Sequence, residues 1–177
     1  MIGHLDAMFA AAVASGATVL TITQPDPVAV NRVARPIRGR LLVYNEGIRA
    51  CARRYGLVLV DFARIPEATH PLFWSADRLH LNTLGHTRMA ATIAAALGLP
   101  PVPGEPGIGA AAVAADPLPP VPLLGRRAAL TQDAVWLRRY FAPWVWRHLL
   151  GHSSSDGIMA KRPVLGPIVV PSREQVS

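Results

Sequence analysis

The chain has 177 residues, of which 51% are hydrophobic and only 16% are charged, so it can form a compact core and is not disordered throughout. Cys51 is the single cysteine, which excludes an internal disulfide framework and the thiolate clusters of structural zinc sites. The 18 Lys and Arg residues outnumber the 11 Asp and Glu residues, but both halves of the chain share the surplus, so nucleic-acid binding is not favoured.

The first part of the chain alternates between helical and strand patterns. Apolar residues at spacings of three and four predict a helix over residues 5–13. The run 17–23 is rich in β-branched residues and lacks polar alternation, which is typical of a strand covered on both faces. Helical spacing returns over residues 40–55, with Gly56 as a cap, and 57–62 form a second apolar strand.

Two irregular stretches follow these strands, at residues 24–40 and 63–81. A final helix is then predicted from a cap at Asn82 or Thr83 to Gly98. The alternation predicts an α/β fold with an open parallel sheet for residues 1–99. Ligands bind such sheets beyond the carboxyl ends of the strands, where both loops should lie.

Beyond residue 99 the composition changes. Residues 100–125 are dominated by Pro, Gly, Ala and Val, which predicts a linker. Residues 126–150 predict an amphipathic helix with a kink at Pro143, and residues 151–177 a flexible tail. The aromatic and arginine residues of this C-terminal helical extension are expected to dock against the domain, and a membrane-surface helix is the alternative.

The segment WSADRLHLNTLGH holds the most informative pair of residues, Asp77 and His80. A carboxylate three residues from an imidazole can accept its ring N–H, fix its tautomer and stabilise the imidazolium. We therefore expect the two side chains to lie within hydrogen-bond reach, at the carboxyl edge of two parallel strands. The pair is the acid and base half of a hydrolytic triad.

These residues also carry a family resemblance. The Asp-x-x-His pair with LNTLGH behind it, and the stretches RLLVYNEGIRACARRYGLVLVDF and ATVLTITQPDP before it, resemble the last blocks of SGNH/GDSL-type serine ester hydrolases. The segment APWVWRHLLGHSSSDG resembles the extension of actinobacterial members. The resemblance implies that His80 is the general base towards a serine hydroxyl and that Asp77 orients it.

The other functional blocks of that family have no counterpart here. The resemblance implies a Gly-Asp-Ser nucleophile motif, a Gly and an Asn that bind the oxyanion, yet no Gly-Asp-Ser occurs in the chain. Met1 falls just before the helix that should follow the Asn-bearing block. The resemblance accordingly implies a truncated domain that is inactive alone, with an incomplete three-layer α/β/α parallel sheet of the SGNH/flavodoxin-like type.

Several other residues of the sequence are candidates for roles at the site. Ser75 is expected to be a plain loop hydroxyl, and Ser153 to Ser155 lack a turn that would position a nucleophile. His86 suggests a metal site with Asp77, but a full ligand set is missing, and packing at the helix start is preferred. Trp74 either lines an acyl pocket or covers the core. Asn45 is expected to be a surface or capping group.

The sequence thus predicts a carboxylic ester hydrolase with a small ester substrate, no cofactor and no bound metal. Self-association through an exposed sheet edge is a further expectation. The chain has no apolar run of the length of a membrane span and no signal-peptide pattern, so a cytoplasmic location is expected. A non-catalytic module that binds a protein or an anionic surface is the alternative from another class.

Overall fold

The computed structural model describes residues 2–100, 104, 106–108, 116–122, 124–152, 159 and 164. The chain divides into two compact units, Met1–Trp136 and Leu137–Ser177. Among its described residues, the first unit contains the helices and strands α1 (Ile2–Ala14), β1 (Leu20–Ile22), α2 (Pro27–Val30), α3 (Arg38–Tyr55), β2 (Val58–Val60), α4 (Thr83–Ala96) and α6 (Arg126–Trp136).

The two strands form a parallel sheet, as the sequence predicts. Leu20 is paired with Val58, and Ile22 with Val60. Backbone bonds from Val58 N–H to Val19 C=O (3.0 Å) and from Thr23 N–H to Val60 C=O (3.2 Å) extend the pairing towards the limits of the predicted runs.

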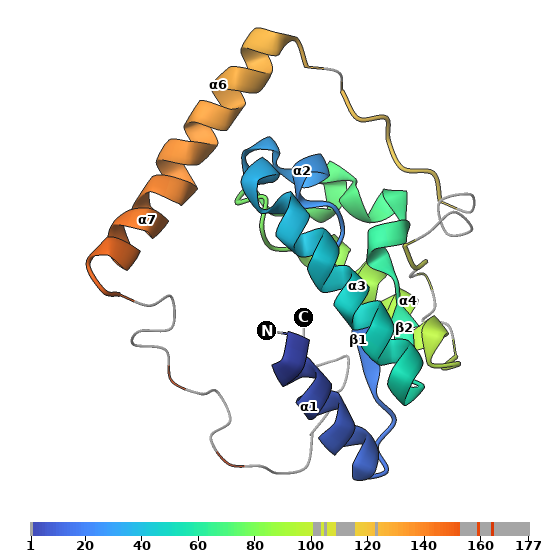
Figure 1. The fold of residues 1–177 in the computed structure, drawn as a ribbon. Helices are drawn as coiled ribbons and strands as arrows, with labels where there is room; N and C mark the ends of the chain where they lie inside the picture. The colour runs from blue at the N-terminus through green and yellow to red at the C-terminus, as the bar shows by residue number, and fades with distance from the viewer. Residues whose placement is uncertain are drawn as a thin grey trace. The chain divides into compact units, whose positions relative to one another are not determined.

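Helices cover both faces of this sheet (Figure 1). Leu20, Ile22 and Val60 face the main core, against which Leu84, Met89 and Ile93 of α4 pack. The residues between them on the strands face the other way, towards α3, since successive side chains of a strand point to opposite faces. The fold is therefore the predicted α/β one, an incomplete three-layer α/β/α arrangement.

Part of the predicted linker packs on the domain. Ile108 is buried in the main core with Phe62 and Phe73, and Leu118 packs against it. Asp116 forms an ion pair with Arg88 of α4. These contacts hold parts of the Pro- and Gly-rich segment against the domain, although the segment has no periodic pattern.

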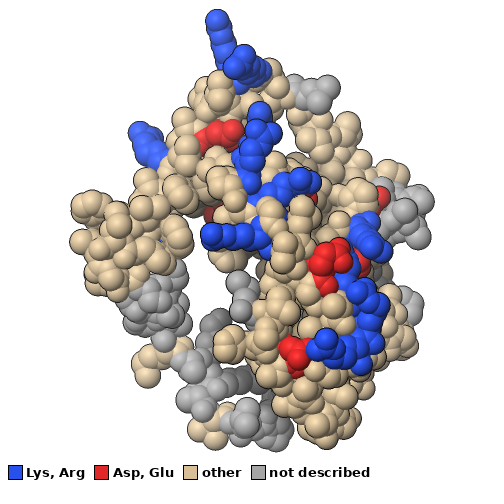
Figure 2. Space-filling view, viewed as in Figure 1, with Lys and Arg blue, Asp and Glu red and all other residues tan. Residues whose placement is uncertain are grey.

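On the other side, α1 packs on α3. Cys51 of α3 is buried, and its thiol lies 3.7 Å from the Asp6 carboxylate of α1. Burial is the main cause that raises the pKa of this thiol, and the negative charge of Asp6 adds to it. Over these two helices, basic and acidic side chains lie side by side (Figure 2), in agreement with the ion pair between Arg54 and Asp6.

The predicted irregular stretches contain short ordered turns. The first holds α2, capped by the Asp26 side chain, and a 3-10 helix, Arg32–Ile37, capped by the Asn31 side chain. The second holds three 3-10 turns, Phe62–Arg64, Pro66–Thr69 and Pro71–Phe73. Figure 1 shows these green turns at the end of the sheet next to α2, which is the carboxyl end.

The predicted C-terminal helix is divided. A π-helical turn, Leu137–Phe141, follows α6, and α7 (Ala142–Leu149) comes after it with Pro143 in its first turn. Proline has no backbone N–H to continue the α-helical hydrogen bonds, which accounts for an irregularity at this point. The tail, predicted over residues 151–177, lies mostly outside the described residues. No helix in the described part of the chain is long and apolar enough to cross a membrane.

Candidate active site

Asp77 and His80 form the predicted hydrogen bond in the long loop after β2. The ring Nδ1 of His80 lies 2.8 Å from Oδ2 of Asp77. The other carboxylate oxygen, Oδ1, accepts the backbone N–H groups of Leu79 (3.0 Å) and His80 (3.1 Å). The carboxylate therefore closes a local turn with one oxygen and holds the imidazole with the other.

The pair lies at the surface, but the two side chains differ in exposure. The side chain of His80 is 72% exposed and that of Asp77 is 29% exposed. With Nδ1 on the carboxylate, Nε2 of His80 forms no hydrogen bond with any described residue and faces solvent. This nitrogen is the one that a base needs to keep accessible.

The environment keeps Asp77 ionised. Partial burial alone would raise the pKa of the Asp77 carboxyl. Hydrogen bonds from the His80 ring and from the backbone N–H groups of His80 and Leu79 outweigh burial and hold the pKa below its usual value. A carboxylate in this state can stabilise an imidazolium on its partner.

Hydrogen bonds within the loop close it on both sides of the pair. Trp74 and Leu81 form an antiparallel bridge, and Ser75 N–H donates to His80 C=O at 2.8 Å. The Ser75 hydroxyl donates to Leu81 C=O at 3.2 Å, which fits the plain loop role expected for it. The loop is thus a short closed ribbon with Asp77 near its tip.

The start of α4 anchors this ribbon. The Asn82 side chain accepts Gly85 N–H at 2.9 Å as the helix cap and donates to Leu72 C=O at 2.7 Å. Its backbone N–H donates to Phe73 C=O at 2.9 Å. A Cβ on Gly85 would lie 2.3 Å from that same carbonyl oxygen. Glycine is therefore required for the close approach of α4 to the ribbon.

Helix α6 contacts the tip of the ribbon. Arg78, between the acid and the base, has a left-handed backbone with φ of 54°, which is unfavourable for a residue with a Cβ. Its guanidinium pairs with Asp133 of α6 at 2.6 Å, and both side chains are largely buried. Trp136 Nε1–H donates to Asp77 C=O at 2.7 Å. These two contacts hold the conformation of the tip.

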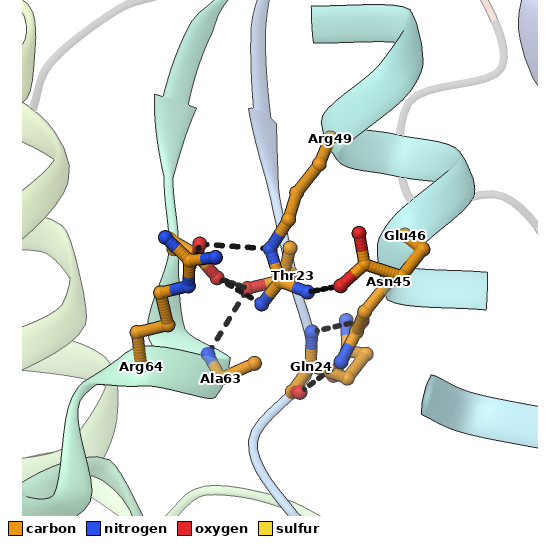
Figure 3. Close-up of polar contacts among 8 residues, drawn as sticks. Thr23, Gln24, Asn45, Glu46, Arg49, Ala63 and Arg64 are labelled. Carbon is orange, nitrogen blue, oxygen red and sulfur yellow. Dashed lines mark hydrogen bonds and ion pairs between the residues drawn. The ribbon is translucent and has the colours of Figure 1, made fainter. Parts of the chain in front are cut away.

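A second polar cluster joins the carboxyl ends of both strands to α3 (Figure 3). Arg49 donates to both oxygens of Asp61 at 2.7 and 2.9 Å and to Glu46 at 2.6 Å. The Thr23 hydroxyl donates to Asp61 at 2.6 Å and accepts Ala63 N–H at 3.0 Å. The hydrogen bond from Arg49 is the main cause that lowers the pKa of the Asp61 carboxyl. Sequence reasoning missed this cluster, although Thr23 and Asp61 directly follow apolar strands.

Asn45 belongs to the same region, and the surface or capping role predicted for it is wrong. The residue is 2% exposed. Its amide donates to Gln24 C=O at 2.7 Å and accepts Gln24 N–H at 2.9 Å. The prediction failed because the partner is backbone 21 residues away, which helical spacing does not reveal.

Two further candidates, His86 and Trp74, form no hydrogen bond with the side chains of Asp77 and His80. His86 is exposed, so the packing role predicted for it is wrong: its position in the first turn of α4 points away from the core. Trp74 packs against the main core and donates from its indole to Ala68 C=O at 3.1 Å, which favours the covering role. Ser153 to Ser155 lie outside the described residues.

A hollow of about 300 Å³ lies between His70 and the prolines of 119–122, and neither Asp77 nor His80 lines it.

Among the described residues, no group of three or more His, Cys, Asp or Glu side chains is arranged to hold a metal ion.

In comparisons with known proteins, residues 2–88 match the model of the GDSL-like Lipase/Acylhydrolase family. No curated protein and no solved structure matches the chain. The family match ends in α4, eight residues after His80, so it includes both strands and the entire ribbon.

Proposed function

Since residues 2–88 belong to the GDSL-like lipase/acylhydrolase family, we propose that Asp77 and His80 are the acid and base of a carboxylic ester hydrolase. Nε2 of His80 takes the proton of a serine hydroxyl as the oxygen attacks the ester carbonyl. The imidazolium then gives this proton to the leaving alcohol. A water molecule, activated by the same ring, releases the acid from the acyl-serine.

The observation that carries this proposal is the 2.8 Å contact between the ring Nδ1 of His80 and the Asp77 carboxylate. It orients the ring, leaves Nε2 for the substrate side and provides a negative charge next to the developing imidazolium. A small ester fits a reaction of this kind, and the proposed steps need no cofactor. The cytoplasmic location stays a prediction.

Ester hydrolysis also requires a nucleophile and oxyanion donors, which Asp77 and His80 do not supply. The 177 residues contain no Gly-Asp-Ser, and the nearby Ser75 hydroxyl donates to Leu81 C=O instead of His80. We infer that residues 1–177 supply the acid and base only. Ester turnover then requires a serine and oxyanion donors from a polypeptide that carries those blocks.

The test joins the amino-terminal blocks of a family member, with their Gly-Asp-Ser, in front of Met1. This chimera should hydrolyse a short activated ester, and His80→Ala should lower kcat about 10⁶-fold. Asp77→Asn should lower kcat about 10⁴-fold, because the ring loses its orienting carboxylate. The matched control is His86→Ala, which removes another exposed histidine of the same region and should change little.

Two outcomes would contradict the proposal. Equal turnover by the chimera and its His80→Ala variant would exclude His80 as the base. Turnover by the 177-residue chain alone that His80→Ala abolishes would show that the chain already contains the nucleophile.

A further inference from the structure

The second unit begins with a helical segment of unusual composition, Leu137–Leu149, which comprises the π-helical turn and α7. Residues 137–152 contain three Arg, two His, two Trp and no Asp or Glu. The family match does not include this segment, and the proposed hydrolysis does not use it.

The segment exposes large apolar side chains. Leu149 is 75% exposed and Trp146 is 64% exposed, and Leu150, just past the helix end, is exposed as well. The half-buried Val145 precedes Leu149 by four residues, and Trp146 lies three residues before Leu149, so these three side chains share one side of the helix.

Within α7 the cationic side chain lies on another side. Arg147 is two residues from both Val145 and Leu149. Residues two apart on a helix point in nearly opposite directions, because each residue turns by about 100°. Helix α7 is therefore amphipathic, with Arg147 opposite Val145 and Leu149, and Arg138 and Arg139 lie in the π-helical turn before it.

We propose that Leu137–Leu149 binds a lipid bilayer with an anionic surface and lies in the plane of that surface. The apolar side would insert Trp146 and Leu149 at the boundary between headgroups and acyl chains, where tryptophan is favoured. The arginines would pair with lipid phosphates. The lack of acidic residues over 137–152 fits a uniformly anionic surface, whereas a protein partner normally presents charges of both signs.

The experiment measures cosedimentation of the full 177-residue chain with vesicles of phosphatidylglycerol and phosphatidylcholine, and with vesicles of phosphatidylcholine alone. Binding should occur with the anionic vesicles and weaken as salt rises. Replacing Trp146 and Leu149 by Ser should weaken it roughly tenfold or more. The matched control is Val43→Ser on α3, which removes another 70% exposed apolar side chain and should leave binding unchanged.

A second pair of variants tests the charge. Arg147→Gln should weaken binding about fivefold, and Arg53→Gln, on α3, should have a smaller effect. Circular dichroism verifies that each variant keeps its helices. Absence of binding to anionic vesicles at low salt would overturn the proposal and favour a protein partner. Equal binding to both kinds of vesicle, or equal losses in test and control variants, would overturn it too.

Discussion

Gly85→Ala tests whether α4 holds the ribbon with the acid and base. The new Cβ would lie 2.3 Å from Phe73 C=O and 3.0 Å from the Leu81 side chain. The carbonyl is backbone and accepts Asn82 N–H, so relief of the overlap must strain the ribbon. Overpacking of this kind costs about 1–3 kcal/mol, whereas alanine in a helix gains about 0.5–1 kcal/mol over glycine. We expect a net loss of about 1–2 kcal/mol.

Thermal unfolding measures this change, since 1 kcal/mol corresponds to about 2–4 °C in Tm for a chain of this size. The control is Gly39→Ala in α3, where a Cβ would meet no atom within 4 Å. That variant should raise Tm, because only the helix gain remains. A Tm that rises for Gly85→Ala as it does for Gly39→Ala would refute the close approach of α4 to the ribbon.

Three further outcomes follow from the polar contacts. Asn45→Ala should lower the free energy of unfolding by about 1–3 kcal/mol, as denaturant titration would measure, because both hydrogen bonds between the Asn45 amide and the Gln24 backbone are lost. The lowered pKa of Asp61 means that its contribution is complete above the unfolded pKa of about 3.9 and is lost as pH falls through the lower folded pKa. When the free energy of unfolding is measured against pH, the Asp61→Asn variant should not show that loss. Asp133→Asn should weaken the pair with Arg78 and accelerate hydrogen exchange of the His80 amide, and an unchanged rate would exclude a role of α6 at the tip.

The sequence predicts those parts of the fold that depend on local pattern. Two apolar runs were sufficient for the parallel strands, and helical spacing with Gly56 was sufficient for α3 and its end. The turns before α3 were not predicted, since they depend on caps by single side chains, Asp26 and Asn31, and have no apolar period. Local chemistry of this kind is readable in principle from the Asp-Pro step at 26–27.

The candidate site shows the same limit. Asp77 and His80 are three residues apart, so their contact followed from spacing. The partners of the tip, Asp133 and Trp136, are more than 50 residues away in sequence, and no local pattern connects them with the loop. Likewise, Arg49 was not singled out, because its carboxylate partner is on a different element.

The buried Cys51 makes the packing of α1 on α3 measurable by chemistry. The thiolate is the form that reacts with alkylating reagents, and both burial and the raised pKa suppress it in the folded chain. Since the chain has no other cysteine, each modification event reports a moment at which the thiol reaches solvent. The labelling rate, divided by the rate of an unprotected thiol, therefore gives the equilibrium constant for the opening that exposes Cys51, without any added probe.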